Sequence, residues 1–205
     1  MTQPSRIAKN DTASRALDCL ETIALEKGLD ALSMREVAAH AGISLASLQY
    51  HYRNKAVLFD AFVTRTISRL RDTIETHLKA SEGPAKLPVF TRYMLEETAD
   101  GREAALIAMI WARSLHEKGA ADSLRDLMSH YLNGVRDIVL ADYPHLDEAE
   151  AATAAHLIVS MLEGSATAFG VGGSPADRQA HLEAAVKIMS EIPLRLKPTE
   201  VPRTR

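Results

Sequence analysis

A lysine and a glutamine in the stretch 33–58 have the chemistry needed to bind a nucleic acid. Lys55 stands at the start of an expected helix, where its charge and the helix N-terminal dipole would both attract a phosphate. Gln49 can donate to N7 and accept from N6 of an adenine in a bidentate pair. The stretch therefore offers one group for a phosphate and one for a base edge. The alternative for Lys55 is an ordinary solvated surface lysine.

Two short helices joined by a tight turn would position these side chains. Ser33 is expected to cap the first helix, with Glu36 three residues later completing a capping box. Gly42 ends that helix, because a left-handed C-terminal residue costs least for glycine. Ser44 caps the second helix, in which Leu48 is the apolar anchor. The pattern predicts a helix-turn-helix whose second helix can enter a DNA major groove.

The pattern continues through small, aromatic and polar residues: AGIS at 41–44, Ala46, Leu48, Tyr50-His51-Tyr52, Asn54-Lys55 and Leu58. This set resembles the DNA-binding signature of the TetR family of bacterial transcriptional regulators. The resemblance extends from about Leu17 to Phe62. It implies an N-terminal helix-turn-helix domain followed by a larger helical body.

The resemblance also implies a set of contacts to double-stranded DNA. Leu45 and Ala46 offer apolar contact suited to a thymine methyl, whereas His51 and Tyr52 either approach phosphates or pack the domain. The family often has a tyrosine where Gln49 stands, and this departure motivates the base-reading hypothesis for Gln49. The expected DNA-binding residues are Ser33, Arg35, Ser44, Leu45, Ala46, Ser47, Gln49, Tyr50, His51, Tyr52 and Lys55, with Arg35 equally interpretable as a plain surface arginine.

Charge is unevenly distributed along the 205 residues, whose net charge is −3. Residues 1–80 hold 11 Lys and Arg against 9 Asp and Glu, and residues 81–205 hold 13 against 18. The positive part coincides with the expected DNA-binding domain.

No apolar run approaches the ~20 residues that span a bilayer, and the first ten residues are polar, so we expect no membrane segment, no signal peptide and a cytoplasmic location.

Catalytic and metal-binding motifs are not found. The chain has no HExxH, GxSxG, CxxC or Walker sequence, and its eight histidines lack metal-ligand spacing. The glycine-rich segment 169–177 does not follow an expected strand, which disfavours a phosphate loop. Cys19 is interpreted as a small buried helix residue. We therefore expect no enzyme activity, no metal and no cofactor.

Helical periodicity predicts an all-α fold of about nine helices. The expected spans are 11–27, two short helices within 33–51, 55–80, 85–99, 102–117, 121–141, 147–169 and 175–192. We expect residues 1–54 to form the helix-turn-helix domain, with residues 1–10 as a mobile arm. Residues 55–197 are expected to form an effector-binding and dimerisation domain, and residues 198–205 a disordered tail.

A homodimer is expected because one reading helix contacts too few bases for useful specificity. The last two helices are rich in small and apolar residues, which would permit close approach by a partner helix. The alternative is that these residues cover the monomer's own core. The expected interface residues are His156, Ser160, Met161, Gly164, Ala168, Leu182, Val186 and Met189.

Large, adaptable side chains gather between residues 90 and 131, where the TetR resemblance implies an effector cavity. Sulfur and aromatic groups suit an apolar or cationic small molecule, although such residues also form packed cores. The segment HLIVSMLEG at 156–164 resembles BetI-like repressors, from which we infer no choline-type effector. A helical interaction module without DNA binding is the alternative function. The expected effector-binding residues are Phe90, Tyr93, Met94, Met109, Trp111, Met128 and Tyr131.

Overall fold

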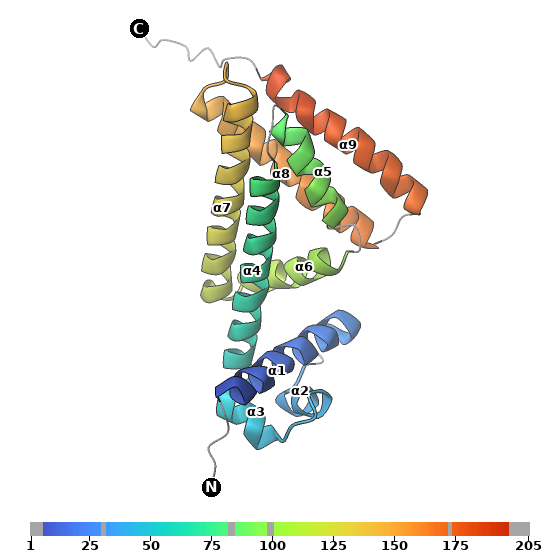
Figure 1. Ribbon diagram of the computed structural model, residues 1–205. Helices are drawn as coiled ribbons and strands as arrows, with labels where there is room; N and C mark the ends of the chain where they lie inside the picture. The colour runs from blue at the N-terminus through green and yellow to red at the C-terminus, as the bar shows by residue number, and fades with distance from the viewer. Residues whose placement is uncertain (1–5, 30–31, 82–84, 98–100, 172–173, 197–205) are drawn as a thin grey trace. The chain divides into compact units, whose positions relative to one another are not determined.

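The computed structural model describes residues 6–29, 32–81, 85–97, 101–171 and 174–196. Over these residues the chain forms nine α-helices and no strand, which confirms the all-α prediction (Figure 1). The helices are α1 Arg6–Lys27, α2 Met34–His40, α3 Leu45–His51, α4 Lys55–Ala80, α5 Lys86–Glu97, α6 Arg102–Ser114, α7 Lys118–Asp142, α8 Glu148–Val171 and α9 Pro175–Arg195.

Several helix boundaries differ from the sequence prediction by a few residues, and two of the differences concern helix starts. The first helix begins at Arg6, so the expected mobile arm is wrong for residues 6–10, which are helical. No glycine or proline interrupts that segment, and its polar residues hide the periodicity without preventing a helix. Gly119 was expected to separate two helices, yet it lies in the first turn of α7, where a helix tolerates glycine better than in its interior. Residues 1–5 and the expected tail 198–205 lie outside the described residues.

The chain divides into two compact units. One comprises Met1–Ser68 and Leu106–Leu124, and the other comprises Arg69–Ala105 and Arg125–Arg205. The long helices α4 and α7 each contribute one part to each unit. The predicted boundary at residue 54 separates the expected DNA-binding domain from the expected effector-binding domain. It is defined by function rather than by compactness, and it stays a prediction.

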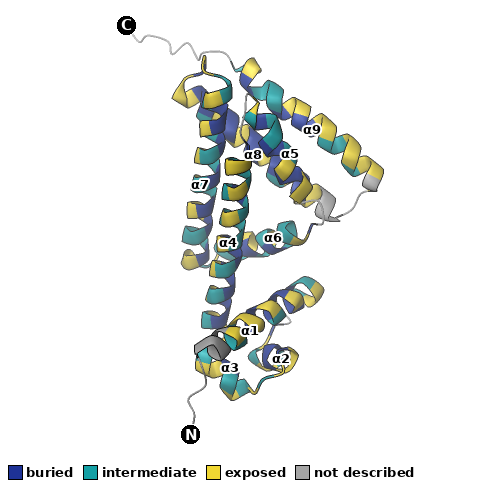
Figure 2. Ribbon diagram, viewed as in Figure 1, coloured by how far each residue is buried: buried dark blue, intermediate teal, exposed yellow. Residues whose placement is uncertain are grey.

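The core of the first unit is built on one side of α1. Ala16, Leu20, Ile23 and Ala24 recur at helical spacing and are buried, whereas the opposite side of α1 is exposed (Figure 2). The helix packs against α2 and α3. The partners buried with it include Val37, Ala38, Leu48, Leu58, Phe59 and Phe62.

An ion-pair cluster joins α4 to α1 beside this core. Arg65 Nη1 donates to Asp18 Oδ1 at 2.6 Å and to the Ser14 carbonyl oxygen at 3.3 Å. Its Nη2 donates to Glu21 Oε2 at 3.4 Å, and Glu21 is buried. The guanidinium therefore compensates a carboxylate that would be costly to bury alone.

The second unit packs α9 against α5 and α8. Arg92 of α5 forms a bidentate ion pair with Glu183 of α9, at 3.0 and 2.9 Å. The Tyr143 hydroxyl donates to the Ser190 carbonyl oxygen at 2.8 Å. These contacts fix which side of α9 faces the unit. The largest fully buried side chains of this core include Leu87, Phe90, Tyr131 and Ile158.

Candidate nucleic-acid interface

The turn between α2 and α3 has the caps that the sequence predicts. Ser33 Oγ accepts from the Glu36 backbone N–H at 3.2 Å, and Ser44 Oγ accepts from the Ser47 N–H at 3.0 Å. Gly42 has φ +63°, the left-handed conformation that favours glycine. The Ile43 N–H donates to the Ala38 carbonyl oxygen at 3.0 Å and closes the turn. The orphan backbone groups at this corner are therefore satisfied.

The predicted capping box does not use Glu36 as expected. The Glu36 carboxylate accepts from Lys27 Nζ at 2.6 Å, a contact from the last turn of α1. The hydrogen bond with Lys27 lowers the pKa of Glu36 and raises that of Lys27. A local sequence motif could not anticipate this competing partner from another helix.

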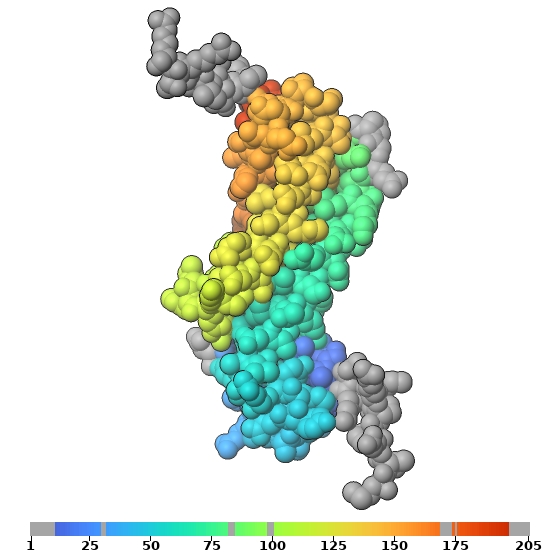
Figure 3. Space-filling view, turned by 90° about the vertical axis from the view of Figure 1, so that its left-hand side faces the viewer, coloured from blue at the N-terminus to red at the C-terminus, as the bar shows by residue number. Residues whose placement is uncertain are grey.

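α3 presents most of its side chains to solvent. Leu48 is fully buried and anchors the helix, whereas Gln49 and Tyr50 are exposed, Tyr50 by 70%. The residues of α3 form part of the surface seen in light blue to cyan in Figure 3. An α-helix with its side chains is about 10–12 Å across, which fits a major groove about 12 Å wide. Of the other expected contacts, Ser44 and Ala46 are exposed, and Leu45, Ser47 and His51 are partly exposed.

Tyr52 belongs to the packing of the unit more than to its outer face. It is partly buried, and its hydroxyl donates to the Ala13 carbonyl oxygen of α1 at 3.2 Å. Burial raises the pKa of Tyr52, so the phenol stays protonated at neutral pH. The sequence leaves two roles open for Tyr52, a phosphate contact or packing of the domain. The hydrogen bond supports packing. His51 lies between Tyr50 and Tyr52, with ring centroids at 5.3 and 6.4 Å.

Cationic and hydroxyl groups flank α3. Lys55 is exposed at the first position of α4, and Asn54 caps that helix by accepting from the Val57 N–H at 3.0 Å. Ser33 and Arg35, on the N-terminal side of α2, are exposed as well. Arg53 is a further exposed cation that the sequence reasoning missed, although its charge directly before the cap was a visible signal. The helix terminus and these cations have the chemistry for phosphate contacts.

Comparisons with known proteins show what this part of the chain is similar to. Residues 21–62 match the family model described as bacterial regulatory proteins, tetR family. This part of the chain is similar to the DNA-binding domain of the TetR family. It is also 24% identical over 151 residues, 73% of each chain, to an uncharacterized HTH-type transcriptional regulator from the dhlA 5' region of Xanthobacter autotrophicus.

Solved structures extend the TetR-like similarity to the whole fold. A transcriptional regulator from Rhodococcus matches at TM-score 0.72 and 27% identity, covering 89% of this chain and 95% of that one. A TetR transcription regulator from Haloarcula marismortui matches at TM-score 0.73 and 17% identity, covering 89% and 96%, and shows the fold alone. The matched family and these solved structures are all described as transcriptional regulators.

The seven expected effector residues belong to both compact units. Phe90 and Tyr131 meet edge to face, with ring centroids 6.1 Å apart, and both are buried with Met94 in the second unit. Tyr93 is 37% exposed and Met128 is partly exposed in that unit. Met109, partly exposed, and Trp111, 45% exposed, belong to the first unit. Within the second unit, the structure brings Phe90 and Tyr131 into direct contact.

The expected dimer residues divide between an outer and an inner face of α8 and α9. His156, Ser160, Gly164 and Ala168 are exposed at four-residue spacing on α8. Met161 and Leu182 are partly exposed. Val186 and Met189 are instead buried in their own unit, because α9 turns these side chains toward the helices it packs on. The large apolar residues exposed on α8 and α9 are Leu157, by 47%, Ile188, by 51%, and Leu194, by 64%.

None of the helices described is long and apolar enough to cross a membrane. Within the same residues, no three side chains among His, Cys, Asp and Glu are grouped in a way that could hold a metal ion.

Proposed function

We propose that this protein is a transcriptional repressor that binds a palindromic operator in double-stranded DNA as a homodimer. In this proposal a small-molecule effector binds the helical body, residues 55–197, and releases the helix-turn-helix domain, residues 1–54, from DNA. The protein would act in the cytoplasm. The observation that carries the proposal is the exposed face of α3, with Gln49 and Tyr50 outward and Arg53 and Lys55 beside it.

Binding to DNA is tested by selecting duplexes from a random pool and measuring their affinity by fluorescence anisotropy at several salt concentrations. We expect affinity to fall steeply with salt, because each neutralised phosphate releases a counterion. Lys55→Gln should reduce the slope of log affinity against log salt by about 1 for each subunit. The matched control is Lys79→Gln, because Lys79 is exposed at the opposite end of the same helix. Selected sites should be two-fold symmetric.

The alternative function, a helical interaction module without DNA binding, makes the opposite forecast. It expects no enrichment of a symmetric site and no difference between Lys55→Gln and Lys79→Gln. Affinity that is equal for selected and random duplexes, with an unchanged slope in Lys55→Gln, would favour that alternative.

The exposed α8 and α9 residues support the dimer. Four small or polar residues on α8 would let a partner helix approach closely, and Leu157 and Ile188 would supply apolar area beside them. Gly164 meets no atom within 4 Å of an added Cβ, so the monomer itself accepts a side chain there. Gly164→Arg should therefore shift the protein toward monomer in light-scattering measurements. Ala108→Arg, at an exposed position on α6, should not.

A buried polar group in the second unit supports an effector site around Phe90 and Tyr131. The Tyr131 hydroxyl is buried without a hydrogen-bond partner among the described residues. An unsatisfied buried hydroxyl costs about 1–3 kcal/mol, which a ligand with a matching polar atom could recover. The resemblance of residues 156–164 to BetI-like repressors stays a prediction, and we propose no choline-type effector from it.

A further inference from the structure

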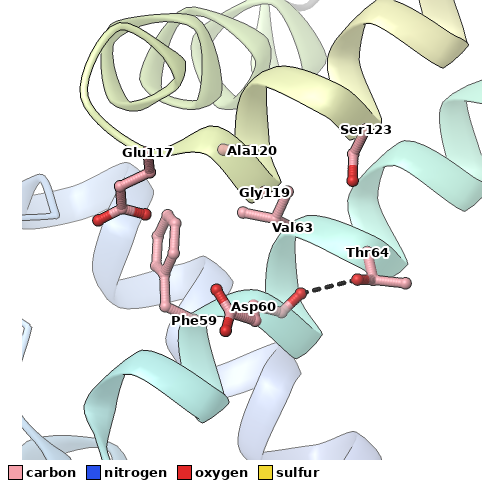
Figure 4. A pocket seen from close by; sticks show the side chains of 8 residues that line it. All are labelled: Phe59, Asp60, Val63, Thr64, Glu117, Gly119, Ala120 and Ser123. Carbon is pink, nitrogen blue, oxygen red and sulfur yellow. Dashed lines mark hydrogen bonds between the residues drawn. The ribbon is translucent and has the colours of Figure 1, made fainter.

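A small cavity, open to solvent at Asp60 and Thr64, lies in the first unit, and none of the seven expected effector residues lines it. It has a volume of about 150 Å³ and is lined by Phe59, Asp60, Val63, Thr64, Glu117, Gly119, Ala120 and Ser123 (Figure 4). The first four residues come from α4, and the last three from α7. Because Gly119 and Ala120 have little or no side chain, nothing from α7 fills this space. A cavity of this size can hold a molecule of about six heavy atoms.

The apolar part of the cavity wall is formed by Phe59 and Val63, which are 1% and 5% exposed. The Arg113 guanidinium lies 3.8 Å from the centre of the Phe59 ring and covers it. Arg113 also forms a bidentate pair with Glu117, with Nε to Oε2 and Nη2 to Oε1 both at 2.6 Å. This stack of three side chains fixes one side of the cavity and neutralises the Glu117 carboxylate.

The polar part of the wall has more hydrogen-bond acceptors than donors. Thr64 Oγ1 donates to the Asp60 carbonyl oxygen at 2.8 Å, which leaves its oxygen as an acceptor toward the cavity. The Asp60 carboxylate accepts no hydrogen bond and forms no ion pair within the described part of the chain. In Figure 4 the Phe59 ring lies between the carboxylates of Asp60 and Glu117, and Ser123 adds a hydroxyl from α7.

We propose that this cavity binds a small organic ammonium ion, with its alkyl part against Phe59 and Val63 and its nitrogen at Asp60. An ammonium group has three donors and no acceptor, which matches a wall of carboxylate and hydroxyl oxygens. Because Arg113 already balances Glu117, Asp60 leaves the site with one uncompensated negative charge. A neutral alcohol of equal size would satisfy neither the charge nor the surplus of acceptors.

The test uses the full chain without DNA and n-propylammonium chloride as the probe. Saturation-transfer NMR with titration should give saturable binding in the millimolar range, with propan-1-ol binding at least tenfold more weakly. Asp60→Asn should weaken binding of n-propylammonium at least tenfold. The matched control is Asp72→Asn, because Asp72 is exposed on the same helix and its carbonyl accepts from Thr76 Oγ1 at 2.7 Å, yet it does not line the cavity.

Three results would overturn this site. They are no saturable binding of n-propylammonium, equal weakening by Asp60→Asn and Asp72→Asn, and displacement by sodium or potassium chloride at the same concentration as the probe. Thr64→Val, which keeps the shape and removes the hydroxyl oxygen, should weaken binding severalfold and gives a second variant if Asp60→Asn unfolds. Since no DNA is present, the outcome is independent of whether the protein binds an operator.

Discussion

The hydroxyl of Tyr52 donates a hydrogen bond of 3.2 Å to the carbonyl oxygen of Ala13, which joins the end of α3 to α1 across 39 residues of sequence. The acceptor lies in the interior of α1, where the carbonyl already serves the helix. The bond therefore holds the C-terminal end of the reading helix at a fixed place on the unit. Leu48, one turn earlier, supplies the apolar half of the same attachment.

Tyr52→Phe should lower the free energy of unfolding by about 1 kcal/mol, because it removes one partly buried hydrogen bond and keeps the ring. Urea denaturation measures the change. Tyr93→Phe is the control, since Tyr93 is 37% exposed, and it should change stability by less than about 0.5 kcal/mol. Equal effects of the two variants would show that the bond to Ala13 contributes nothing.

The ion pairs of Arg65 should be strongly coupled to Glu21. Arg65→Met removes the guanidinium beside a carboxylate whose side chain is 5% exposed, and we expect a loss of about 3 kcal/mol. Glu21→Gln in the same chain should recover part of that loss, because it removes the buried charge. A double-mutant cycle by urea denaturation gives the coupling, and additive single effects would contradict it.

The local signals of the turn were predictable from sequence, whereas contacts between distant segments were not. Ser33, Gly42, Ser44 and Asn54 act on backbone groups within three residues, so their types and spacing are sufficient. The partner of Glu36 comes from α1, nine residues away, and no periodicity encodes it. The cavity at Asp60 joins residues 59–64 to residues 117–123, which only the folded chain brings together.

The sequence also does not predict which side of α9 is buried. Its apolar residues Leu182, Val186, Ile188 and Met189 occur on more than one side of the helix, so the pattern does not define a single inner face. The packing on α5 and α8 buries Val186 and Met189 and leaves Ile188 outside. The apolar residues of α9 are therefore compatible with either a core or an interface, and only the tertiary contacts determine which of them are buried.

Glu163 should make the stability of the folded chain fall as pH rises above its ordinary pKa. Burial raises the pKa of this carboxyl in the folded protein. Between the ordinary pKa and the raised pKa, the folded state therefore binds more protons than the unfolded state. The free-energy cost of burying the ionised carboxylate is absent below about pH 4 and reaches its full value above the raised pKa of the folded protein. Glu163→Gln should therefore stabilise the protein at pH 7 and have little effect near pH 4, as measured by thermal unfolding at both pH values.

A matched substitution separates this effect from a general gain in amide content or a smaller net negative charge. Glu96→Gln alters an exposed carboxylate in the same unit and should change the melting temperature little at either pH. If Glu163→Gln and Glu96→Gln raised stability equally at pH 7, burial of Glu163 would not be the cause.

Gln49 should determine one position of each operator half-site. Its amide is exposed on α3, one residue after the buried anchor Leu48, so the helix can present it to a base while Leu48 holds the helix in place. A bidentate pair with adenine discriminates against other bases by about 1–3 kcal/mol. Gln49→Ala should therefore relax the preference at one base pair of each half-site and leave the others unchanged. Anisotropy titrations with all single-base variants of the selected operator measure this, with Lys55→Gln as a comparison that weakens every variant alike. Uniform weakening by Gln49→Ala as well would assign Gln49 to a phosphate contact instead.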